Sequence, residues 1–160
     1  MKVTSLKISD VKVIEPIIYK DNRGYFFESF NNKNFNNLVG SSINFVQDNH
    51  SESKKGVLRG LHYQKSPYIQ GKLIRVTKGE IFDVAVDIRK NSKSYGKYFS
   101  IILSEKNNKQ LWIPAGFAHG FMSLVDETIV KYNTSKKYSP KHERSLLWND
   151  KKINIKWPDL

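Results

Sequence analysis

Short runs of β-branched and aromatic residues recur along most of this chain, and turn-type residues separate them. Residues 81–88 (Ile-Phe-Asp-Val-Ala-Val-Asp-Ile) alternate apolar and polar side chains over their later part. Such alternation is typical of a strand with one buried face. Similar runs lie at 69–74, 98–104, 110–113, 120–124 and 128–132. Strands that follow one another about every 8–12 residues favour an antiparallel sandwich or barrel.

One short helix is expected, over residues 32–38, where asparagines flank Phe35. No longer stretch has the 3.6-residue apolar periodicity of a helix. The sequence also has no internal repeat, low-complexity block or linker-like stretch. We therefore expect a single domain over residues 1–160.

Composition excludes several classes of protein. An apolar content of 39% is too high for a disordered chain. The absence of cysteine excludes disulfides, thiolate metal sites and cysteine nucleophiles. No apolar run approaches the roughly 20 residues that cross a bilayer, and the N-terminal residues lack the apolar core of a signal peptide. We expect a cytoplasmic protein with no membrane partner.

The charge balance is strongly basic, with 27 Lys and Arg against 15 Asp and Glu, a net charge of +12. The lysines are scattered, and the densest clusters are pairs such as residues 136–137. Biased lysine usage on a solvated surface explains this pattern, and a diffuse field that attracts anionic small molecules is the alternative. Without a basic stripe, we expect no nucleic-acid partner.

Two segments combine turns or strands with groups that bind anions or move protons. Residues 21–28 (Asp-Asn-Arg-Gly-Tyr-Phe-Phe-Glu) contain a turn, and Arg23 has the planar fork that suits phosphate or carboxylate. A surface ion pair beside a hairpin is the simpler interpretation. Residues 58–64 (Leu-Arg-Gly-Leu-His-Tyr-Gln) place His62 in a strand, either as a general base or as a hydrogen-bonded core histidine.

Further polar groups enter otherwise apolar strands. Lys72 is costly to bury unless it meets an anion or a polarised oxygen. His119 lies between small residues, where a ligand can approach the backbone closely. The phenol of Tyr132 can give a proton while a neighbouring group accepts one.

A metal site is not favoured. The chain has four histidines, at positions 50, 62, 119 and 142, and no His-x-His pair. Spacing alone leaves a three-histidine site open, but the usual pair of ligands on one strand is missing. We expect no metal and no other cofactor.

Taken in order, the motifs are specific. They are Asp21-x-Arg23-Gly24-x-Phe26-x-Glu28, Gln47-Asp48-Asn49-x-Ser51, Leu58-Arg59-Gly60-Leu61-His62, Gly71-Lys72, Phe82-Asp83-Val84-x-Val86-Asp87 and Pro114-x-Gly116-Phe117-Ala118-His119-Gly120-Phe121. From about residue 10 to Pro158 the chain closely resembles the dTDP-4-dehydrorhamnose 3,5-epimerase family. The resemblance implies an all-β, cupin-type jelly roll (a double-stranded β-helix), a homodimer, no metal, and a 4-keto-6-deoxy nucleotide sugar as substrate.

The resemblance also implies roles for single residues. His62 is similar to the general base, Tyr132 to the proton donor on the opposite face of the sugar, and Lys72 to the group beside the C4 oxygen. Tyr138 is similar to the aromatic residue that stacks on the nucleotide base. Other substrate-binding positions correspond to Arg23, Glu28, Gln47, Asn49, Arg59, His119 and Glu143.

The chemistry agrees with these roles, because a C4 carbonyl acidifies the protons at C3 and C5 and donors near its oxygen stabilise the enolate. One departure bears on activity. The family pattern continues past Trp157-Pro158 into a segment resembling Leu-Ser-x-Lys-Asp, whose Asp pairs with the catalytic histidine, whereas the present sequence runs to Leu160. Asp83 and Asp87 are candidates to replace that carboxylate.

The expected activity is 3,5-epimerisation of dTDP-4-dehydro-6-deoxy-D-glucose to dTDP-4-dehydro-L-rhamnose, in dTDP-L-rhamnose biosynthesis. Two alternatives stay open at this point. One is a 3- or 5-epimerase or a ketoisomerase acting on a related nucleotide sugar. The other is a protein that binds nucleotide sugars without catalysis.

Overall fold

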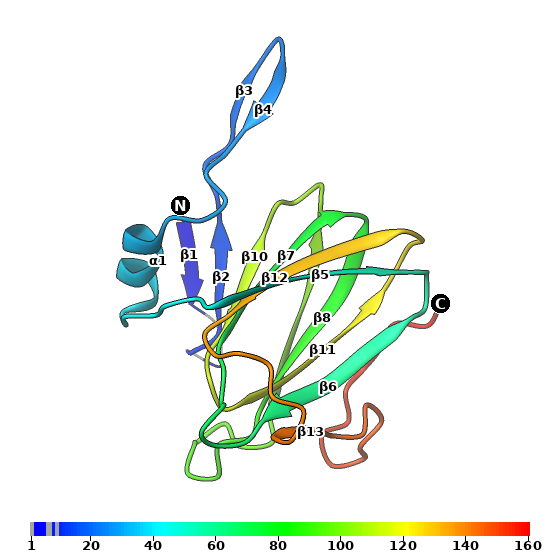
Figure 1. The fold of residues 1–160 in the computed structure, drawn as a ribbon. Helices are drawn as coiled ribbons and strands as arrows, with labels where there is room; N and C mark the ends of the chain where they lie inside the picture. Colours follow the sequence, from blue (N-terminus) through cyan, green and yellow to red (C-terminus); the bar gives the residue numbers. More distant parts are fainter. Residues whose placement is uncertain (1, 6–7, 9) are drawn as a thin grey trace.

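Two antiparallel sheets make up the body of the computed structural model, which describes residues 2–5, 8 and 10–160 (Figure 1). Among these residues the strand order is β1-β2-β10-β7-β12-β5 in the first sheet and β13-β6-β11-β8-β9 in the second. The first sheet comprises β1 (Lys2–Ser5), β2 (Lys12–Glu15), β5 (Gln47–Ser53), β7 (Lys72–Lys78), β10 (Gln110–Ile113) and β12 (Thr128–Thr134). The second comprises β6 (Leu58–Gln64), β8 (Glu80–Asp87), β9 (Tyr98–Ser104), β11 (Phe117–Ser123) and β13 (Glu143–Ser145). The predicted all-β jelly roll is confirmed.

Apolar side chains fill the space between the sheets over part of its length. On β12, Val130 is fully buried while Lys131 points outward and is exposed. The main cluster is formed by Ile8, Val11, Val13, Ile74, Val76, Ile81, Ala85, Leu103, Leu111, Ile113, Phe117, Phe121 and Val130. Farther along β12 the inward side chains become Tyr132 and Thr134, which border a cavity instead. The core therefore ends where the cavity begins.

A second apolar cluster covers the outer face of the second sheet. Val84, Val86 and Ala118 are completely buried there, and Ile155 and Trp157 from the C-terminal segment pack over them. As a result β8 and β11 are buried on both faces. These buried strands carry His119 on β11 and Asp83 on β8, and they hold both side chains in place.

Two glycines allow the paired strands β6 and β11 to approach each other closely. A Cβ atom at Gly60 would lie 2.5 Å from Cα of Gly120, and Gly60 has a φ of +131°. The register between the strands shifts between His119 and Phe121, and His119 pairs with His62 just before that shift. The glycines thus bring two histidines to neighbouring positions on one sheet.

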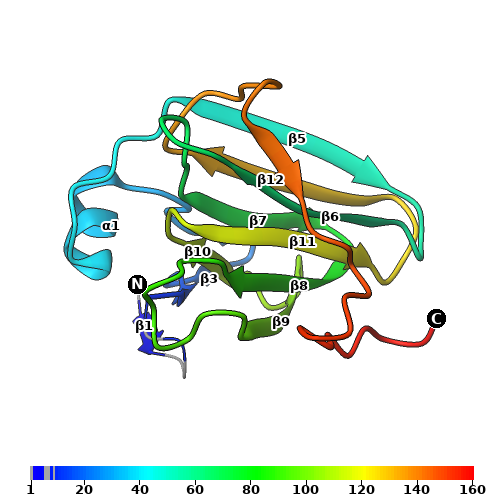
Figure 2. The same ribbon diagram turned by 90° about the horizontal axis from the view of Figure 1, so that it is seen from below.

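Helix α1 (Asn32–Val39) confirms the predicted helix and lies at the side of the sandwich (Figures 1 and 2). The side chain of Asn31 accepts a hydrogen bond from the N–H of Asn34, and Gly40 ends the helix in the left-handed conformation. Phe35 is buried against Trp112, with ring centroids 5.2 Å apart. No helix in the described part of the chain has the length and apolarity needed to cross a membrane.

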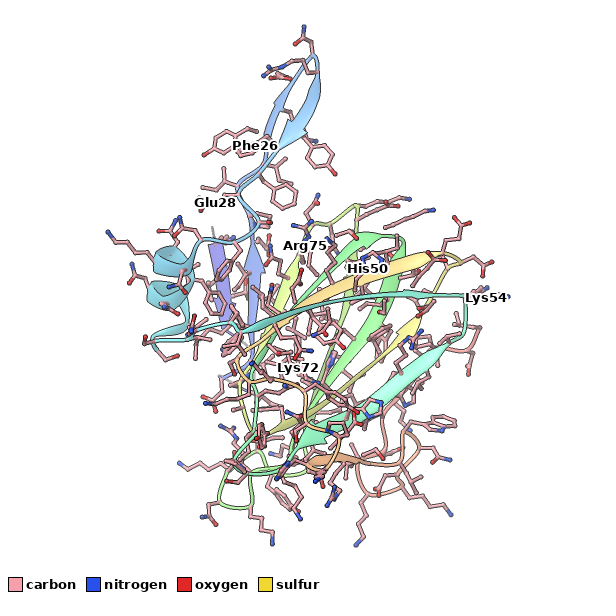
Figure 3. All side chains as sticks on the ribbon, viewed as in Figure 1. Phe26, Glu28, His50, Lys54, Lys72 and Arg75 are labelled. Atoms are coloured by element: carbon pink, nitrogen blue, oxygen red, sulfur yellow. The ribbon has the colours of Figure 1, made fainter. Side chains whose placement is uncertain are left out.

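Strands β3 (Tyr19–Asp21) and β4 (Gly24–Phe26) form a hairpin that projects away from both sheets (Figure 1). Its turn is the predicted one around Arg23. The side chains of Tyr25 and Phe26 are 62% and 69% exposed, and Phe26 is labelled on the projecting arm in Figure 3. The hairpin therefore presents aromatic surface that the rest of the chain does not cover.

Candidate active site

A cavity of about 620 Å³ opens between the two sheets. Its walls come from β5, β7 and β12 of the first sheet, from β6, β11 and β13 of the second, and from the segment that joins β12 to β13. It brings together most of the predicted site residues: Gln47, Asn49, Arg59, His62, Lys72, His119, Tyr132, Tyr138 and Glu143. The volume is in the range of small-molecule and cofactor sites.

His62 lies on β6, with about half of its side chain exposed. Its Nδ1 is 3.5 Å from Oε1 of Glu143. Burial lowers the pKa of His62 below its usual value, and nearby Lys72 and His119 add to that effect while Glu143 opposes it. The imidazole is therefore neutral at neutral pH, the form that accepts a proton.

Tyr132 reaches the same cavity from β12, in the opposite sheet. Burial raises the pKa of its phenol, an effect that Arg59 partly opposes. The phenol is consequently protonated at neutral pH. One wall of the cavity thus carries a proton acceptor and the other a proton donor.

Lys72, labelled in Figure 3, is buried at the start of β7. Burial lowers the pKa of its ammonium group to about 8, although the carboxylates of Asp83 and Glu143 favour the charged form. Near neutral pH the side chain still carries its proton. A buried ammonium group of this kind can donate to a carbonyl or enolate oxygen in the cavity.

His119 is held from behind by Asp83. Its Nε2 lies 3.0 and 3.1 Å from the two carboxylate oxygens, and both side chains are buried. Asp83 is therefore the hydrogen-bond partner of His119, and its predicted role as the partner of His62 is wrong. The register explains this, because His119 and Phe121 on β11 pair with Ala85 and Asp83 on β8.

Asp87, the other candidate partner of His62, is hydrogen-bonded to other residues. It accepts hydrogen bonds from Nε and Nη2 of Arg89 at 2.9 and 2.7 Å, and from the hydroxyls of Ser92 and Ser94 at 2.6 Å each. Burial opposes its ionisation, but these donors outweigh burial and hold its pKa well below the usual range. Among the described residues, the carboxylate within 4 Å of His62 is Glu143.

The polar residues of β5 and β6 are interconnected. Gln47 donates to Oδ1 of Asn49 at 2.8 Å and accepts from the N–H of Tyr138 at 2.9 Å. Arg59 donates to Oγ of Ser53 and to the carbonyl of Glu52, which ties its guanidinium to β5. With Arg59 and Lys72, the cavity wall carries cations suited to phosphate.

Tyr138 is about half exposed, and its hydroxyl donates to Oε2 of Glu143 at 2.7 Å. This hydrogen bond raises the pKa of the phenol. Glu143 therefore lies between an exposed aromatic ring and the imidazole of His62.

Arg23 and Glu28 do not line the cavity. Arg23 is at the tip of the projecting hairpin, where it pairs with Asp21 at 2.6 Å. Glu28 accepts hydrogen bonds from Asn31 and Asn34 at the start of α1. Figure 3 shows Glu28 at the base of the hairpin and Lys72 within the body of the sandwich. In this chain alone, neither residue meets the other site residues.

Sequence reasoning did not select every polar residue of the cavity. Ser51, Gln64, Gln70 and Thr134 also border it. Strand alternation identifies Gln64, because side chains two residues apart share a face of the sheet and His62 is two residues away. No group of three or more His, Asp or Glu residues in the described part of the chain is arranged to hold a metal ion.

A neutral imidazole and a protonated phenol line one cavity from opposite sheets of a jelly roll, with a buried ammonium group in the same cavity, and these are groups that acid–base enzymes use. The chain belongs to the dTDP-4-dehydrorhamnose 3,5-epimerase family, whose model matches residues 5–160. It is accordingly an isomerase of the epimerase type.

Individual relatives also match this sequence over nearly the whole chain. The dTDP-4-dehydrorhamnose 3,5-epimerase of Shigella flexneri is 57% identical over 158 residues, which cover 99% of this chain and 87% of the relative. The crystal structure of dTDP-6-deoxy-D-glucose-3,5-epimerase from Legionella pneumophila, in complex with dTDP-4-keto-L-rhamnose, aligns with a TM-score of 0.95 at 48% identity. That alignment covers 98% of this chain and 83% of the other. A 3'-monoepimerase from Streptomyces bikiniensis in complex with dTDP-quinovose aligns at 0.91 with 32% identity, covering 97% and 78%.

Proposed function

We propose that this protein converts dTDP-4-dehydro-6-deoxy-D-glucose to dTDP-4-dehydro-L-rhamnose by inverting C3 and C5. The observation that carries the proposal is the placement of neutral His62 and protonated Tyr132 on opposite walls of one cavity, with the ammonium group of Lys72 buried beside them. These three groups can supply the base, the acid on the opposite face and the donor to the ketone oxygen that inversion next to a ketone uses.

The steps follow from the protonation states. His62 removes the proton from C3 or C5, the C–H electron pair forms a double bond from that carbon to C4, and the π electrons of the C4 carbonyl move onto its oxygen to give an enolate. Lys72 donates a hydrogen bond to the enolate oxygen, which lowers the barrier by an amount on the order of several kcal/mol. Tyr132 then delivers a proton to the same carbon from the opposite face. Proton exchange with water restores His62 and Tyr132 for the second carbon.

In this proposal the nucleotide occupies the part of the cavity near Tyr138 and Arg59. Tyr138 offers an exposed ring on which a base can stack. Arg59 binds the diphosphate, and Gln47, Asn49, His119 and Glu143 provide further polar contacts. These roles assign the remaining predicted residues of the cavity.

The range of relatives favours inversion at both carbons. Identity to the 3,5-epimerase of Shigella flexneri is 57%, whereas identity to the Streptomyces 3'-monoepimerase is 32%. Both kinds share the fold, so the choice between one carbon and two depends on details of the sugar site.

Deuterium incorporation tests the proposal. In D₂O with dTDP-4-dehydro-6-deoxy-D-glucose, both C3 and C5 should acquire deuterium, as measured by NMR of the recovered sugar. Label at a single carbon would indicate a monoepimerase. Tight binding without label would indicate a protein that binds nucleotide sugars without catalysis.

We propose further that the protein works as a homodimer in which each hairpin reaches the cavity of the other subunit. Arg23 and Glu28 resemble substrate-binding residues, yet they lie outside the cavity of their own chain. A second copy resolves this, and contact with it would cover the exposed aromatic rings of Tyr25 and Phe26. We also propose that residues 1–160 act as one domain and that the enzyme is cytoplasmic, which cell fractionation tests.

A further inference from the structure

Gln64 borders the cavity, but its side-chain amide is occupied by the protein itself. Nε2 donates to the carbonyl oxygens of Tyr68 at 2.8 Å and Lys137 at 3.1 Å, and Oε1 accepts from the N–H of Ser139 at 2.6 Å. The residue is only 6% exposed. Because both N–H bonds have partners, Gln64 has no donor left for a ligand.

The contacts of Gln64 fall on both sides of Tyr138. The carbonyl of Lys137 and the N–H of Ser139 bind Gln64 on β6, and the N–H of Tyr138 binds Gln47 on β5. Three neighbouring backbone groups are therefore held from the two sheets at once. The backbone under the Tyr138 ring is fixed, although the ring itself is about half exposed.

The same strand carries the base. Gln64 and His62 are two residues apart on β6, and Glu143 on β13 pairs with Gln64 in the ladder. Glu143 also accepts from the hydroxyl of Tyr138 and lies 3.5 Å from His62. Gln64 thus links the backbone at Tyr138 to the strand that positions His62.

We propose that Gln64 is a positioning residue that holds the backbone at Tyr138 in place before the ligand binds, so that the ring is ready to stack on the nucleotide base. The inference rests on the function proposed above. Without the amide, the segment around Tyr138 gains freedom that the ligand must remove on binding. Nucleotide affinity then falls more than the rate of the bound complex.

The substitution Gln64→Met keeps the length of the side chain and removes all three hydrogen bonds. The dissociation constant for dTDP, measured by calorimetry, should rise roughly tenfold, equivalent to about 1.4 kcal/mol. At saturating substrate, kcat should stay within about twofold of the wild type, so that the loss appears in KM. A roughly tenfold loss in kcat with KM unchanged would contradict the proposal.

Thr128→Val is a matched control on β12, at the end of that strand farther along the chain from Tyr138. Thr128 is also buried, and its hydroxyl donates to the carbonyl of Val125 at 2.8 Å. This variant should unfold more easily and bind dTDP as the wild type does. Gln64→Leu, which also removes all three hydrogen bonds without adding a charge, provides the same test should the Met variant fail to fold.

A double substitution separates positioning from a general structural role. Tyr138→Ala weakens dTDP binding by itself, and adding Gln64→Met should then cause no further loss, because no ring remains to be positioned. Additive losses would overturn the proposal. If the wild type does not bind dTDP, the proposed function fails; if it does and Gln64→Met binds equally well, only the role of Gln64 fails.

Discussion

At the scale of single residues, the site depends on environments that push two ordinary groups toward opposite roles. Burial acts on both His62 and Tyr132, and in each case it favours the neutral form. For an imidazole the neutral form is a base, and for a phenol it is an acid. Burial therefore favours both the proposed proton acceptor and the proposed proton donor.

Substitution of these two residues should separate proton removal from proton return. His62→Ala should abolish deuterium exchange at C3 and C5 without unfolding the protein. Tyr132→Phe should retain more exchange than net inversion, because abstraction continues while the donor on the opposite face is missing. Both quantities come from one NMR time course in D₂O, and parallel loss of the two in Tyr132→Phe would argue against its donor role.

The pH profile of kcat/KM should be bell-shaped. Activity should rise with pH as His62 loses its proton, at a pH below the ordinary value of 6.5. It should fall above about pH 8, where Lys72 loses the charge that stabilises the enolate. A profile that stays flat from pH 7 to pH 10 would show that the charge of Lys72 is not needed.

Lys72 should also cost the protein stability. Its pKa is about 8 in the folded chain and near 10.5 when exposed, so between these values the unfolded chain binds more protons and stability rises with pH. Below pH 8 the full cost is present. Lys72→Met should therefore raise the free energy of unfolding at pH 7 by roughly 3 kcal/mol while it reduces turnover.

Urea denaturation at pH 7 and pH 10 measures this effect. The wild type should gain stability between these two values, and Lys72→Met should lose that gain. Lys78→Met is the matched control on the same strand, because Lys78 is half exposed and pairs with Glu127 at the surface. Its substitution should change stability by less than about 1 kcal/mol.

At the scale of elements, the close approach of the paired strands β6 and β11 constrains the sequence near the site. Gly60→Ala would place a Cβ 2.5 Å from Cα of Gly120, at a φ of +131°. We expect a loss of about 3 kcal/mol or more in the free energy of unfolding. Gly96→Ala, with positive φ but open space around it, should lose only about 1 kcal/mol. Similar losses in both variants would show that backbone strain, and not the close approach of β6 and β11, determines the loss of stability.

The elements also show how far sequence patterns reach. Strands β9 and β10 have the predicted bounds, because β-branched runs end at clear turn residues. The run at 69–74 predicted a strand that starts too early, since Gln70 and Gly71 bond to the segment after β12 and β7 begins only at Lys72.

Strand β5 was not predicted, because Gln47–Ser53 has no apolar side chain on which a periodicity could be seen. Its inward residues Gln47, Asn49 and Ser51 face the cavity and not the core. A strand with one face toward a polar cavity and the other toward solvent gives no hydrophobic signal. Family resemblance identified Gln47 and Asn49 as site residues but not Ser51, and the partner of Asp83 required the register of β8 and β11.

At the scale of the whole molecule, the hairpin and the cavity are parts of one proposed assembly. The prediction is complementation between inactive variants. Arg23→Ala/Glu28→Ala and His62→Ala should each be nearly inactive alone. After mixing and subunit exchange, about half of the dimers should be mixed, and each should have one complete site, which restores about a quarter of wild-type activity.

Restored deuterium exchange in the mixture measures this outcome. If Arg23 and Glu28 act within their own chain, mixing should restore nothing. The dimer itself is checked by sedimentation, where Tyr25→Ser/Phe26→Ser should shift the protein toward the monomer.

The cavity is also bounded by the rims of the sandwich. β5 ends the first sheet and β13 ends the second, and Gln47, Asn49 and Glu143 belong to these two strands. A terminal strand is bonded along one side only, so replacing its side chains disturbs no ladder beyond it. The proposed catalytic residues His62, Lys72 and Tyr132 lie on interior strands, so a substitution on either edge strand changes the cavity wall without removing a strand that carries them.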